Sequence, residues 1–577
     1  MEGEPRFRPD FTSLTFDRFE LDLRSGELRR EGQKVPLQAK PFQLLALLVE
    51  HSGEVVRREE VWRALWHANT FLDFDHGVAV AINKIRGALG DSAVRPQFIE
   101  TLPKRGYRFI APVQRSVAAL TRRAANQPSI AVLPFTTIGP GEESQYFGDG
   151  LAEDIINALA QMPGLMVAGR TSSFFFGRRE ADVGEIGRSL NVQYVLEGSV
   201  QRSGKVVRVT AQLIDAGTGF HAWSARYDRE MTELFALQDE ITTSIAAALR
   251  VTLSPEPDRT QRQPPDLAAY DAYLRAREHL LVRPSPGSGA LAKQFLERAI
   301  QLDQTFARPH SLLGVYYTGQ AFWAGLRARD AIQSARAAEQ AALRLDPSLS
   351  EAHAMMGCCA GMDFDWAEAE RHWSVAMPRE PVSHDVLLWY ANHFLLPTGR
   401  VGEAVAVESN VIDNDPLNLL YRHHLALSLW HAGRLRDAEA ELRRVLAVDD
   451  RYPLALNSLG ALYAQQGQFE GALQCAEAAY SLAPLALFGG HLAAVLRRTG
   501  ATSRADSLVE GLRSGTSCGA SVGLTVYYGL LGQFPEAAEC AERAIEERYT
   551  MLIQVIRPLL RSSTQWPALA RRMNIHG

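Results

Sequence analysis

The sequence predicts a multidomain chain that joins α+β parts to an all-α part, and three observations lead to this fold class. Short alternating strands, amphipathic helices and a closing hairpin occupy residues 14–113. Strands then alternate with helices over residues 129–254. A period of about 34 residues runs through residues 267–577, as in an α-solenoid built from helical pairs. The length of 577 residues exceeds what one hydrophobic core holds, so several domains are expected.

Charge is unevenly distributed along the chain. The formal net charge is −5, yet residues 1–127 contain 20 Lys and Arg against 16 Asp and Glu. The excess is largest in residues 76–123, where nine cations accompany only Asp91 and Glu100. A basic segment joined to an acidic body is typical of a nucleic-acid-binding module, although a solvated charged surface gives the same composition.

The five cysteines indicate reduced thiols rather than a disulfide framework or a metal site. All lie between Cys358 and Cys540, and none shows a paired CxxC spacing. The first residues lack the apolar core of a signal peptide, and no apolar run reaches the roughly 20 residues that a membrane helix needs. We therefore expect a cytoplasmic protein without membrane contact, and we expect no metal and no cofactor.

The first hundred residues predict a small α+β module. Residues 16–37 alternate apolar and polar side chains between turn-forming pairs, which predicts three or four short antiparallel strands. A helix with an apolar face of Phe and Leu follows from Pro41, and a second helix is expected near residues 58–66.

A third helix is expected over Asp75–Leu89. Val78, Ile82, Ile85 and Leu89 recur at helical spacing and predict one buried stripe. Asn, Lys and Arg are the side chains that read base edges or hold phosphates, and all three types occur among the remaining positions. The positions expected to point outward are His76, Ala79, Asn83, Lys84, Arg86 and Gly87.

Residues 98–110 predict a β-hairpin whose tip carries two cations. Lys104 and Arg105 lie at the turn, a position suited to entering a minor groove or holding the phosphate backbone. The helix and the hairpin together give the expected DNA-binding residues: His76, Asn83, Lys84, Arg86, Thr101, Lys104, Arg105 and Tyr107.

The order of strands, three helices and hairpin resembles the OmpR/PhoB-type winged helix-turn-helix, above all that of ToxR- and CadC-like one-component transcriptional regulators. The segments ALWHANTFLDFDHGVAVAINKIRGALGDS and FIETLPKRGYRFIAPV carry this resemblance. It implies that Asp75–Leu89 is the recognition helix, that residues 67–74 contact RNA polymerase, and that two protomers bind spaced half-sites. Because the module begins almost at residue 1, we expect no phospho-receiver domain before it. Membrane-anchored relatives of the ToxR/CadC type have a transmembrane helix after the winged helix, and we expect none here.

A polar, basic linker is expected at residues 114–128, followed by an α/β domain over 129–254. The segments GDGLAEDIINAL, VLEGSVQRSG and RVTAQLIDAGTGFHAWSARYDRE resemble the TolB-N-terminal-like domain, which has no assigned chemistry. Asp149, Glu153 and Asp154 begin a helix, where acidic side chains complement the helix dipole more often than they bind metal. No phosphate-binding glycine motif and no catalytic constellation is found, so we expect no enzyme.

A Pro-rich connector at 255–266 leads to a helical array over 267–577. Pro347, Pro381, Pro416, Asp450 and Pro484 recur every 34 or 35 residues, which is the tetratricopeptide period of two helices per unit. About eight units are expected, starting near residues 273, 316, 350, 385, 419, 453, 486 and 518. Stacked units predict an extended superhelix with a concave groove for a protein or peptide. An array that only dimerises or supports the other domains is the alternative.

Together these features predict a one-component, sequence-specific DNA-binding transcriptional regulator whose repeat array is a sensor or a protein-interaction module. The expected partners are double-stranded DNA, RNA polymerase, an unknown protein or peptide in the repeat groove, and a second copy of the chain on DNA. A tetratricopeptide scaffold whose winged helix contacts protein is the alternative, and the cationic hairpin argues against it. An enzyme is a third hypothesis, since the last two parts also accompany class III cyclase domains, but no nucleotide or metal motif supports it.

Overall fold

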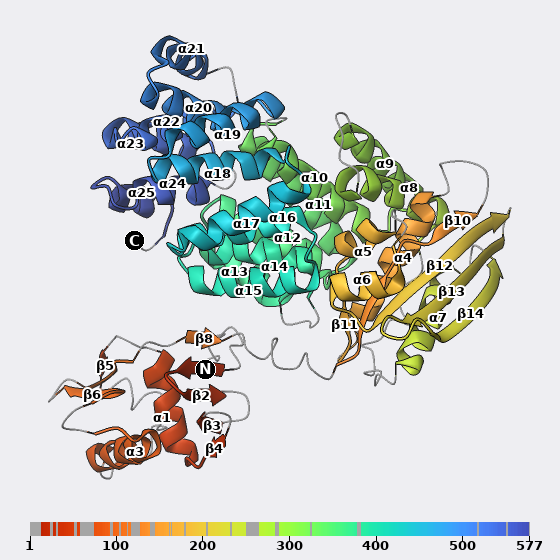
Figure 1. The fold of residues 1–577 in the computed structure, drawn as a ribbon, viewed down its shortest axis with the longest axis horizontal. Helices are drawn as coiled ribbons and strands as arrows, with labels where there is room; N and C mark the ends of the chain where they lie inside the picture. The colour runs from red at the N-terminus through yellow and green to blue at the C-terminus, as the bar shows by residue number, and fades with distance from the viewer. Residues whose placement is uncertain are drawn as a thin grey trace. The chain divides into compact units, whose positions relative to one another are not determined.

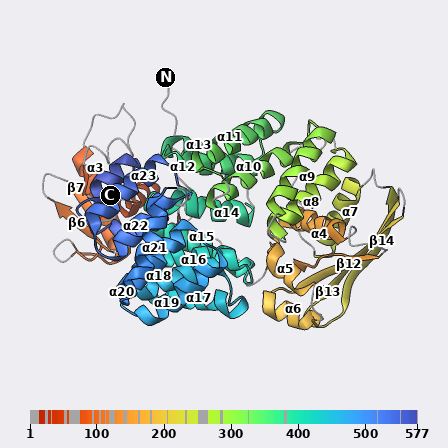
Figure 2. The same cartoon turned by 90° about the horizontal axis from the view of Figure 1, so that it is seen from above.

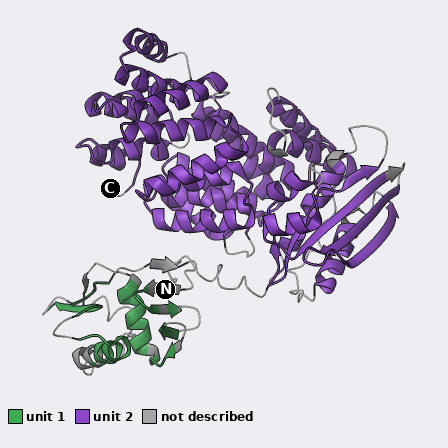
Figure 3. Ribbon diagram, in the orientation of Figure 1, with its two compact units in different colours: residues 1–126 green, residues 127–577 purple. Residues whose placement is uncertain are grey.

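The computed structural model describes residues 13–22, 27–30, 33–50, 55–57, 74–92, 96–102, 106–111, 114–116, 127–138, 145–160, 162, 164–177, 181–203, 206–230, 234–249, 265–282, 288–323, 326–377, 382–515, 518–549 and 552–575. The chain divides into two compact units, residues 1–126 and 127–577 (Figure 3). The first unit contains the predicted small α+β module. The second unit joins the α/β domain to the helical array.

An antiparallel sheet opens the first unit (Figure 1). Its strands pair in sequence order, as predicted: β1 (Ser13–Phe16), β2 (Phe19–Asp22), β3 (Glu27–Arg30) and β4 (Gln33–Val35). A further strand, β8 (Gln114–Ser116), pairs with β1. The segment expected to be linker from residue 114 therefore begins as part of this sheet, because it supplies the hydrogen-bonding partner that the edge of β1 would otherwise lack.

Two helices and a second sheet complete the first unit. Helix α1 (Ala39–Glu50) buries the predicted apolar face, and α3 (Phe74–Leu89) follows later in the chain. The second sheet is antiparallel, with the order β5 (Val55–Arg57), β7 (Gly106–Phe109) and β6 (Ile99–Leu102). The helix expected near residues 58–66 and residues 67–73 of the expected polymerase-contacting loop lie outside the described residues.

Four phenylalanines from distant parts of the sequence hold the two sheets of the first unit together. Phe16 and Phe19 from the first sheet contact Phe98 and Phe109 from the second, with ring centroids 4.9 to 5.7 Å apart. All four rings are buried, and most meet edge to face, an arrangement that the ring quadrupole favours. The first unit therefore has one core shared by both sheets.

The α/β domain of the second unit is a mixed six-stranded sheet. Its strands follow the order β11-β9-β12-β13-β14, and β10 pairs beside β9 on β12. The elements are β9 (Ser129–Val132), β10 (Thr136–Ile138), α4 (Gln145–Ala160), β11 (Met166–Val167), α5 (Arg170–Phe176), α6 (Val183–Leu190), β12 (Tyr194–Ser203), β13 (Val206–Asp215), β14 (His221–Glu230) and α7 (Leu234–Ala248). The alternation predicted from sequence is confirmed, with β10 and α5 as additions.

The two faces of this sheet are covered unequally. Helices α4 and α7 pack on one face, over a core that runs from β9 to β14. Helices α5 and α6 cover the opposite face only over β9 and β12. The side chains of β13 alternate between buried and exposed, as expected for strands with one uncovered face.

Helical pairs fill the rest of the second unit (Figure 1). In sequence order they are α8 (Leu267–Arg277) and α9 (Ser288–Leu302), α10 (Ala307–Phe322) and α11 (Ala328–Leu345), α12 (Ser350–Met362) and α13 (Trp366–Ala376), α14 (His384–Tyr390) and α15 (Val401–Asn414), α16 (Leu419–His431) and α17 (Leu435–Val448), α18 (Pro453–Gln465) and α19 (Phe469–Leu482), α20 (Ala486–Arg498) and α21 (Thr502–Arg513), α22 (Ala520–Leu530) and α23 (Phe534–Glu546), and α24 (Leu552–Leu560) and α25 (Trp566–Arg572).

The predicted repeat register is confirmed from the third pair onward. Helices α12, α14, α16, α18 and α20 begin within one residue of the expected starts, and α22 begins two residues later. The first two pairs begin earlier than expected, at Leu267 and Ala307. The described residues contain nine pairs rather than eight, because α24 and α25 form a further pair, whose first helix begins 32 residues after the start of α22.

The predicted extended superhelix is wrong, because the last pairs of the array pack against earlier ones. Gln554 on α24 donates to the carbonyl of Asn392 at 2.5 Å, and Trp366 on α13 donates to the carbonyl of Met573 at 2.9 Å. Arg557 donates to the carbonyls of Leu396 and Pro397 at 2.7 and 3.0 Å. The array therefore closes on itself, and α24 and α25 cover apolar surface that an open superhelix would expose.

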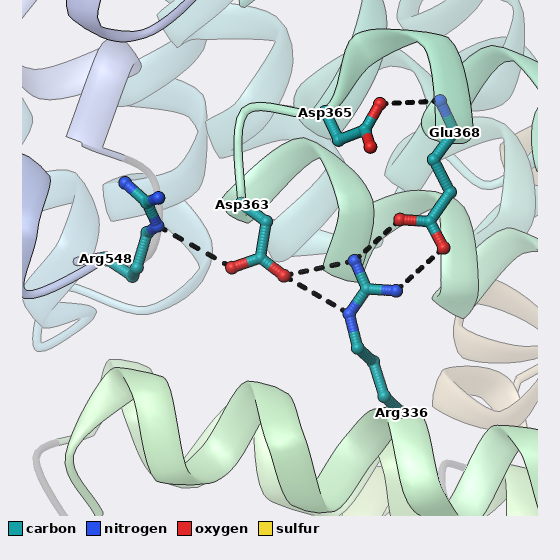
Figure 4. Close-up of polar contacts among 5 residues, drawn as sticks. All are labelled: Arg336, Asp363, Asp365, Glu368 and Arg548. Carbon is teal, nitrogen blue, oxygen red and sulfur yellow. Dashed lines mark hydrogen bonds and ion pairs between the residues drawn. The ribbon is translucent and has the colours of Figure 1, made fainter.

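An arginine cluster reinforces this closure (Figure 4). Arg336 on α11 contacts Glu368 with two hydrogen bonds of 2.9 Å and contacts Asp363 at 3.0 Å. The other carboxylate oxygen of Asp363 lies 3.6 Å from Arg548, which follows α23. Hydrogen bonds from Arg336 lower the pKa of Glu368, so this carboxylate stays charged. Three helical pairs are thus joined through one carboxylate–guanidinium network.

The α/β domain is attached to the array at its first pair. Arg277 at the end of α8 is buried and forms ion pairs with Glu153 and, at 3.7 Å, with Asp154 on α4. Burial opposes the ionisation of Glu153, but the charges of Arg277, Arg170 and Arg308 together outweigh it and lower the pKa of that carboxyl. The expected helix-dipole role of these acidic residues is wrong, because α4 begins at Gln145 and has no acidic side chain in its first turn.

A second attachment joins the α/β domain to the fourth pair. The Asp415 carboxylate, just after α15, accepts a hydrogen bond of 2.8 Å from the backbone N–H of Ser172 in the first turn of α5. The N–H of Gly169 donates to the carbonyl of Asn414 at 2.7 Å. A Cβ atom at Gly169 would lie 2.3 Å from the Asp415 side chain, so this close approach requires glycine.

The fourth and fifth pairs bury a carboxyl without a cationic partner. Glu408 on α15 is 1% exposed, and its Oε1 accepts a hydrogen bond of 3.0 Å from Asn392. Hydrogen bonds from Asn392 and from the nearby buried Ser428 hydroxyl oppose the effect of burial on the pKa of this carboxyl, but burial outweighs them. Burial raises the pKa of Glu408 to about 8, so the carboxyl is protonated in the folded protein at neutral pH.

We predict that Glu408→Gln stabilises the protein at pH 8 and much less at pH 5. Because the folded pKa exceeds the ordinary value of 4.5, stability from this group is present below pH 4.5 and is lost as pH rises toward 8. The amide removes this loss and keeps a donor for Ser428. Urea unfolding at both pH values should show a gain that is roughly 3 kcal/mol larger at pH 8. The exposed variant Glu470→Gln is the control, and equal gains at both pH values would contradict the prediction.

Candidate nucleic-acid interface

Helix α3 has the buried stripe that its sequence predicts. It begins at Phe74, one residue before the predicted start. Val78, Ile82, Ile85 and Leu89 are at most 2% exposed and belong to the core of the first unit. The orientation of the helix is therefore fixed by apolar burial, which leaves the opposite face to solvent.

The solvent face of α3 carries Val80, Asn83, Lys84 and Gly87 at helical spacing. All four are exposed, and Val80 is 38% exposed despite its apolar side chain. The Lys84 ammonium donates to the side-chain oxygen of Gln38 at 2.6 Å. Val80 is not among the residues predicted to contact DNA. It lies three residues before Asn83 and four before Lys84, so the helical repeat places it on the same stripe. An exposed valine among amide and ammonium groups suits contact with the methyl group of thymine.

Arg86 does not point outward, so that part of the prediction is wrong. Its side chain is buried, and its guanidinium donates to the carbonyl of Ile99 and to the hydroxyl of Thr101, both at 2.9 Å. Both acceptors lie on β6, the first strand of the hairpin. A buried guanidinium has to direct its N–H groups to protein acceptors, and β6 supplies two of them. Arg86 thus ties the helix to the hairpin.

The end of α3 makes a second connection to the hairpin. Gly90 adopts a φ of 71°, and the N–H of Asp91 donates to the carbonyl of Arg86 at 2.9 Å, as in a Schellman motif. The Asp91 carboxylate then accepts hydrogen bonds from the backbone N–H groups of Gln97 and Ile99, at 2.7 and 2.9 Å. Helix and hairpin are therefore positioned as one rigid element.

The hairpin is closed by a cross-strand ion pair. Glu100 on β6 lies opposite Arg108 on β7, and two hydrogen bonds of 2.6 and 2.8 Å join their side chains. Thr101 is exposed, as expected of a residue at an interface. Tyr107 is 6% exposed and packs in the core, so its expected place at the surface is wrong. Alternation along β7 places its ring on the same side as Phe109.

The remaining predicted contacts fall outside what the structure describes. Lys104 and Arg105 belong to the turn between β6 and β7, which is not described, and for His76 only the helical backbone is described. Of the eight predicted contacts, Asn83, Lys84 and Thr101 are therefore the ones that the described structure places on exposed surface.

Two properties of the described residues bear on other kinds of site. No group of three or more His, Cys, Asp and Glu side chains is placed to hold a metal ion in the described part of the chain. No helix in that same part combines the length and the apolar character needed to cross a bilayer.

Family models match the first two domains. Residues 32–109 match the model described as "Transcriptional regulatory protein, C terminal". Residues 125–244 match the model described as "HilA/YgeH-like transcriptional regulator, second domain". The second match shows that the α/β domain is similar to the second domain of HilA/YgeH-like transcriptional regulators. The resemblance of the α/β domain to the TolB-N-terminal-like domain stays a prediction.

Individual relatives differ in how much of the chain they share. A putative adenylate cyclase 3 of Rhizobium meliloti is 42% identical over 191 residues, which is 33% of this chain and 32% of that protein. The transcriptional regulator HilA of Salmonella typhimurium is 23% identical over 424 residues, 71% of this chain and 73% of that protein. The chain thus spans about a third of the length of the cyclase relative.

A solved structure also matches the first unit. The RstA DNA-binding domain of Klebsiella pneumoniae, in complex with the RstA box, is 28% identical, with 17% of this chain and 96% of that chain covered and a TM-score of 0.16. Sequence matches to the CadC activator of Escherichia coli and the cholera toxin transcriptional activator of Vibrio cholerae cover 15% and 16% of this chain. Over residues 32–109 the chain is thus similar to the C-terminal domain of transcriptional regulatory proteins, and its relatives include the HilA, CadC and cholera toxin regulators.

Proposed function

We propose that the chain is a one-component transcriptional regulator whose first unit binds a specific double-stranded DNA sequence. The observation that carries this proposal is the exposed stripe of Val80, Asn83 and Lys84 on α3, within a domain that matches the model for the C terminus of transcriptional regulatory proteins. Polar and cationic side chains on a helix face beside a hairpin fit a major groove with an adjacent backbone or minor groove.

Each residue in the proposed interface has a distinct role. Asn83 hydrogen-bonds a base edge, Val80 contacts a thymine methyl group, and Lys84 neutralises a phosphate. Lys104 and Arg105 hold the backbone or enter the minor groove from the hairpin turn, as predicted from their sequence position. Arg86 does not contact DNA in this proposal. It is a positioning residue that holds the hairpin at a fixed angle to α3.

The second unit is proposed to receive the signal or a protein partner. Because the array closes on itself, it lacks the extended groove expected to bind a peptide, and a smaller surface would bind the signal or partner. A pocket of about 760 Å³ lined by helices α20 to α23 offers one, since it combines two cations and two phenol rings with the carboxylates of Asp506, Glu510 and Glu536. Arg497 and Arg513 contact the hydroxyls of Tyr527 and Tyr528 there, at 3.1 and 2.7 Å. RNA polymerase contact through residues 67–74 remains part of the proposal.

We predict that Lys84→Ala and Arg105→Ala each weaken DNA binding and flatten its salt dependence. Each neutralised phosphate contributes about 0.9 to the slope of log K against log salt, so either variant should lower the slope by about that amount. Fluorescence anisotropy over a salt series measures it. Arg436→Ala, an exposed cation on α17, is the matched control. Unchanged slopes in both variants would remove these residues from the interface.

We predict a different signature for Arg86→Met. Loss of the two hydrogen bonds to β6 frees the hairpin, so the affinity for DNA falls. The slope of log K against log salt changes by no more than the phosphate contacts of the hairpin contribute to it. Hydrogen exchange of peptides covering residues 96–102 should be faster in the full chain, by an amount matching about 1–3 kcal/mol of local stability. Asn83→Ala should leave this exchange unchanged because its side chain is exposed. Wild-type exchange in Arg86→Met would refute the positioning role.

Sequencing of genomic fragments captured by the full-length protein tests the proposed function as a whole. We expect a few strongly enriched sites, and we expect the double variant Asn83→Ala with Lys84→Ala to lose them. Enrichment that is broad or absent, and equal in both proteins, would favour the scaffold alternative. Because one relative is named a putative adenylate cyclase, cyclic AMP formation is assayed on the same preparation, and none is expected.

A further inference from the structure

Strand β14 forms an open edge of the six-stranded sheet. It pairs with β13 along one side over its whole length, and no strand pairs with its other side in the described part of the chain. Figures 1 and 2 both place β14 at the outer margin of the second unit, away from the helical array. The edge is ten residues long, and its backbone groups can accept a further strand.

The exposed side of β14 carries charges of both signs. Ser224, Arg226, Asp228 and Glu230 alternate with more buried residues and face the side of the sheet that α7 does not cover. The side chains of Arg226 and Asp228 are 57% and 46% exposed. Within the chain, Asp228 accepts a hydrogen bond of 2.6 Å from Arg208 on β13, whereas Arg226 lies 3.3 Å from Asp228. Arg226 is thus held loosely, at the rim of the sheet.

Charge selects one way of pairing two such edges. In an antiparallel pair of identical strands, each residue faces its mirror position about the central residue, and both side chains lie on the same face. Centring on Arg226 places the two copies of Arg226 opposite each other. Centring on Asp228 does the same for Asp228, although it also places Arg226 opposite Glu230. Centring on Tyr227 instead places Arg226 of each copy opposite Asp228 of the other, which makes two ion pairs.

We propose that two copies of the chain associate through β14, paired antiparallel about Tyr227. The six-stranded sheet then continues from one protomer into the other. The charged side chains of β14 disfavour pairing with unrelated strands, but those of two copies of β14 are complementary to each other. The self-complementary sequence is what favours a second copy over an unrelated peptide as the occupant. The proposal does not depend on DNA binding, and it assigns the dimer contact to the second unit.

Sedimentation velocity of the full chain without DNA tests this association. The wild-type chain of 63.7 kDa should form a dimer of twice that mass. Arg226→Asp and Asp228→Arg should each raise the dimer dissociation constant at least about tenfold, because each places like charges opposite one another twice. An equimolar mixture of the two variants should recover the dimer, since their charges are complementary across the axis. Arg436→Asp, on α17, should behave as wild type.

Hydrogen exchange provides a readout that does not depend on the variants. In the wild-type chain, peptides covering residues 221–230 should exchange more slowly at dimeric than at monomeric concentrations. Circular dichroism melts establish that each variant folds. A wild-type monomer at all concentrations, a dimer insensitive to Arg226→Asp, or exchange of β14 that does not change with concentration would each overturn the proposal.

Discussion

Buried arginines join elements of this protein that are not neighbours in the sequence. A guanidinium removed from water must direct its N–H groups to fixed acceptors, or it costs several kcal/mol. Arg86 finds such acceptors on β6 for one of its terminal nitrogens, Arg277 finds them on α4, and Arg557 on the turn after η6 (Ala391–Leu395). In each case the acceptors belong to a different element, so the arginine fixes the angle between the two elements. The hairpin, the α/β domain and the last repeat are all positioned in this way.

This constraint also explains which features could be predicted from sequence. Apolar periodicity reports burial directly, so the stripe of α3 and the register of the repeats were found correctly. Arg86 was misplaced because a cation at a polar helix position is normally exposed, and nothing in its neighbours marks Thr101 as its partner. Val80 was missed for the converse reason, since a valine next to a buried stripe is normally part of it.

Contacts between distant segments account for the larger error. A repeat period describes how each pair stacks on the next, and it contains no information about pairs that meet after the array has curved. The carbonyls of Asn392, Leu396 and Pro397 that receive α24 are backbone groups, which have no sequence signature. Strand β8 escaped prediction similarly, because three residues carry too little pattern to separate a strand from a linker. The recognition helix of the candidate interface was therefore predictable from sequence, whereas the contacts that hold the helix and the hairpin in place were less so.

Closure of the array has a consequence for how the protein is made. The pairs from α12 to α16 can fold locally as they leave the ribosome, but the apolar surface that α24 and α25 cover stays open until residue 575 has emerged. Nascent chains therefore present that surface to solvent for the time needed to synthesise the last four pairs. A stop codon or a proteolytic cut before α24 would leave it open permanently. Truncated chains should accordingly be recognised by chaperones and proteases although most of their helices are intact.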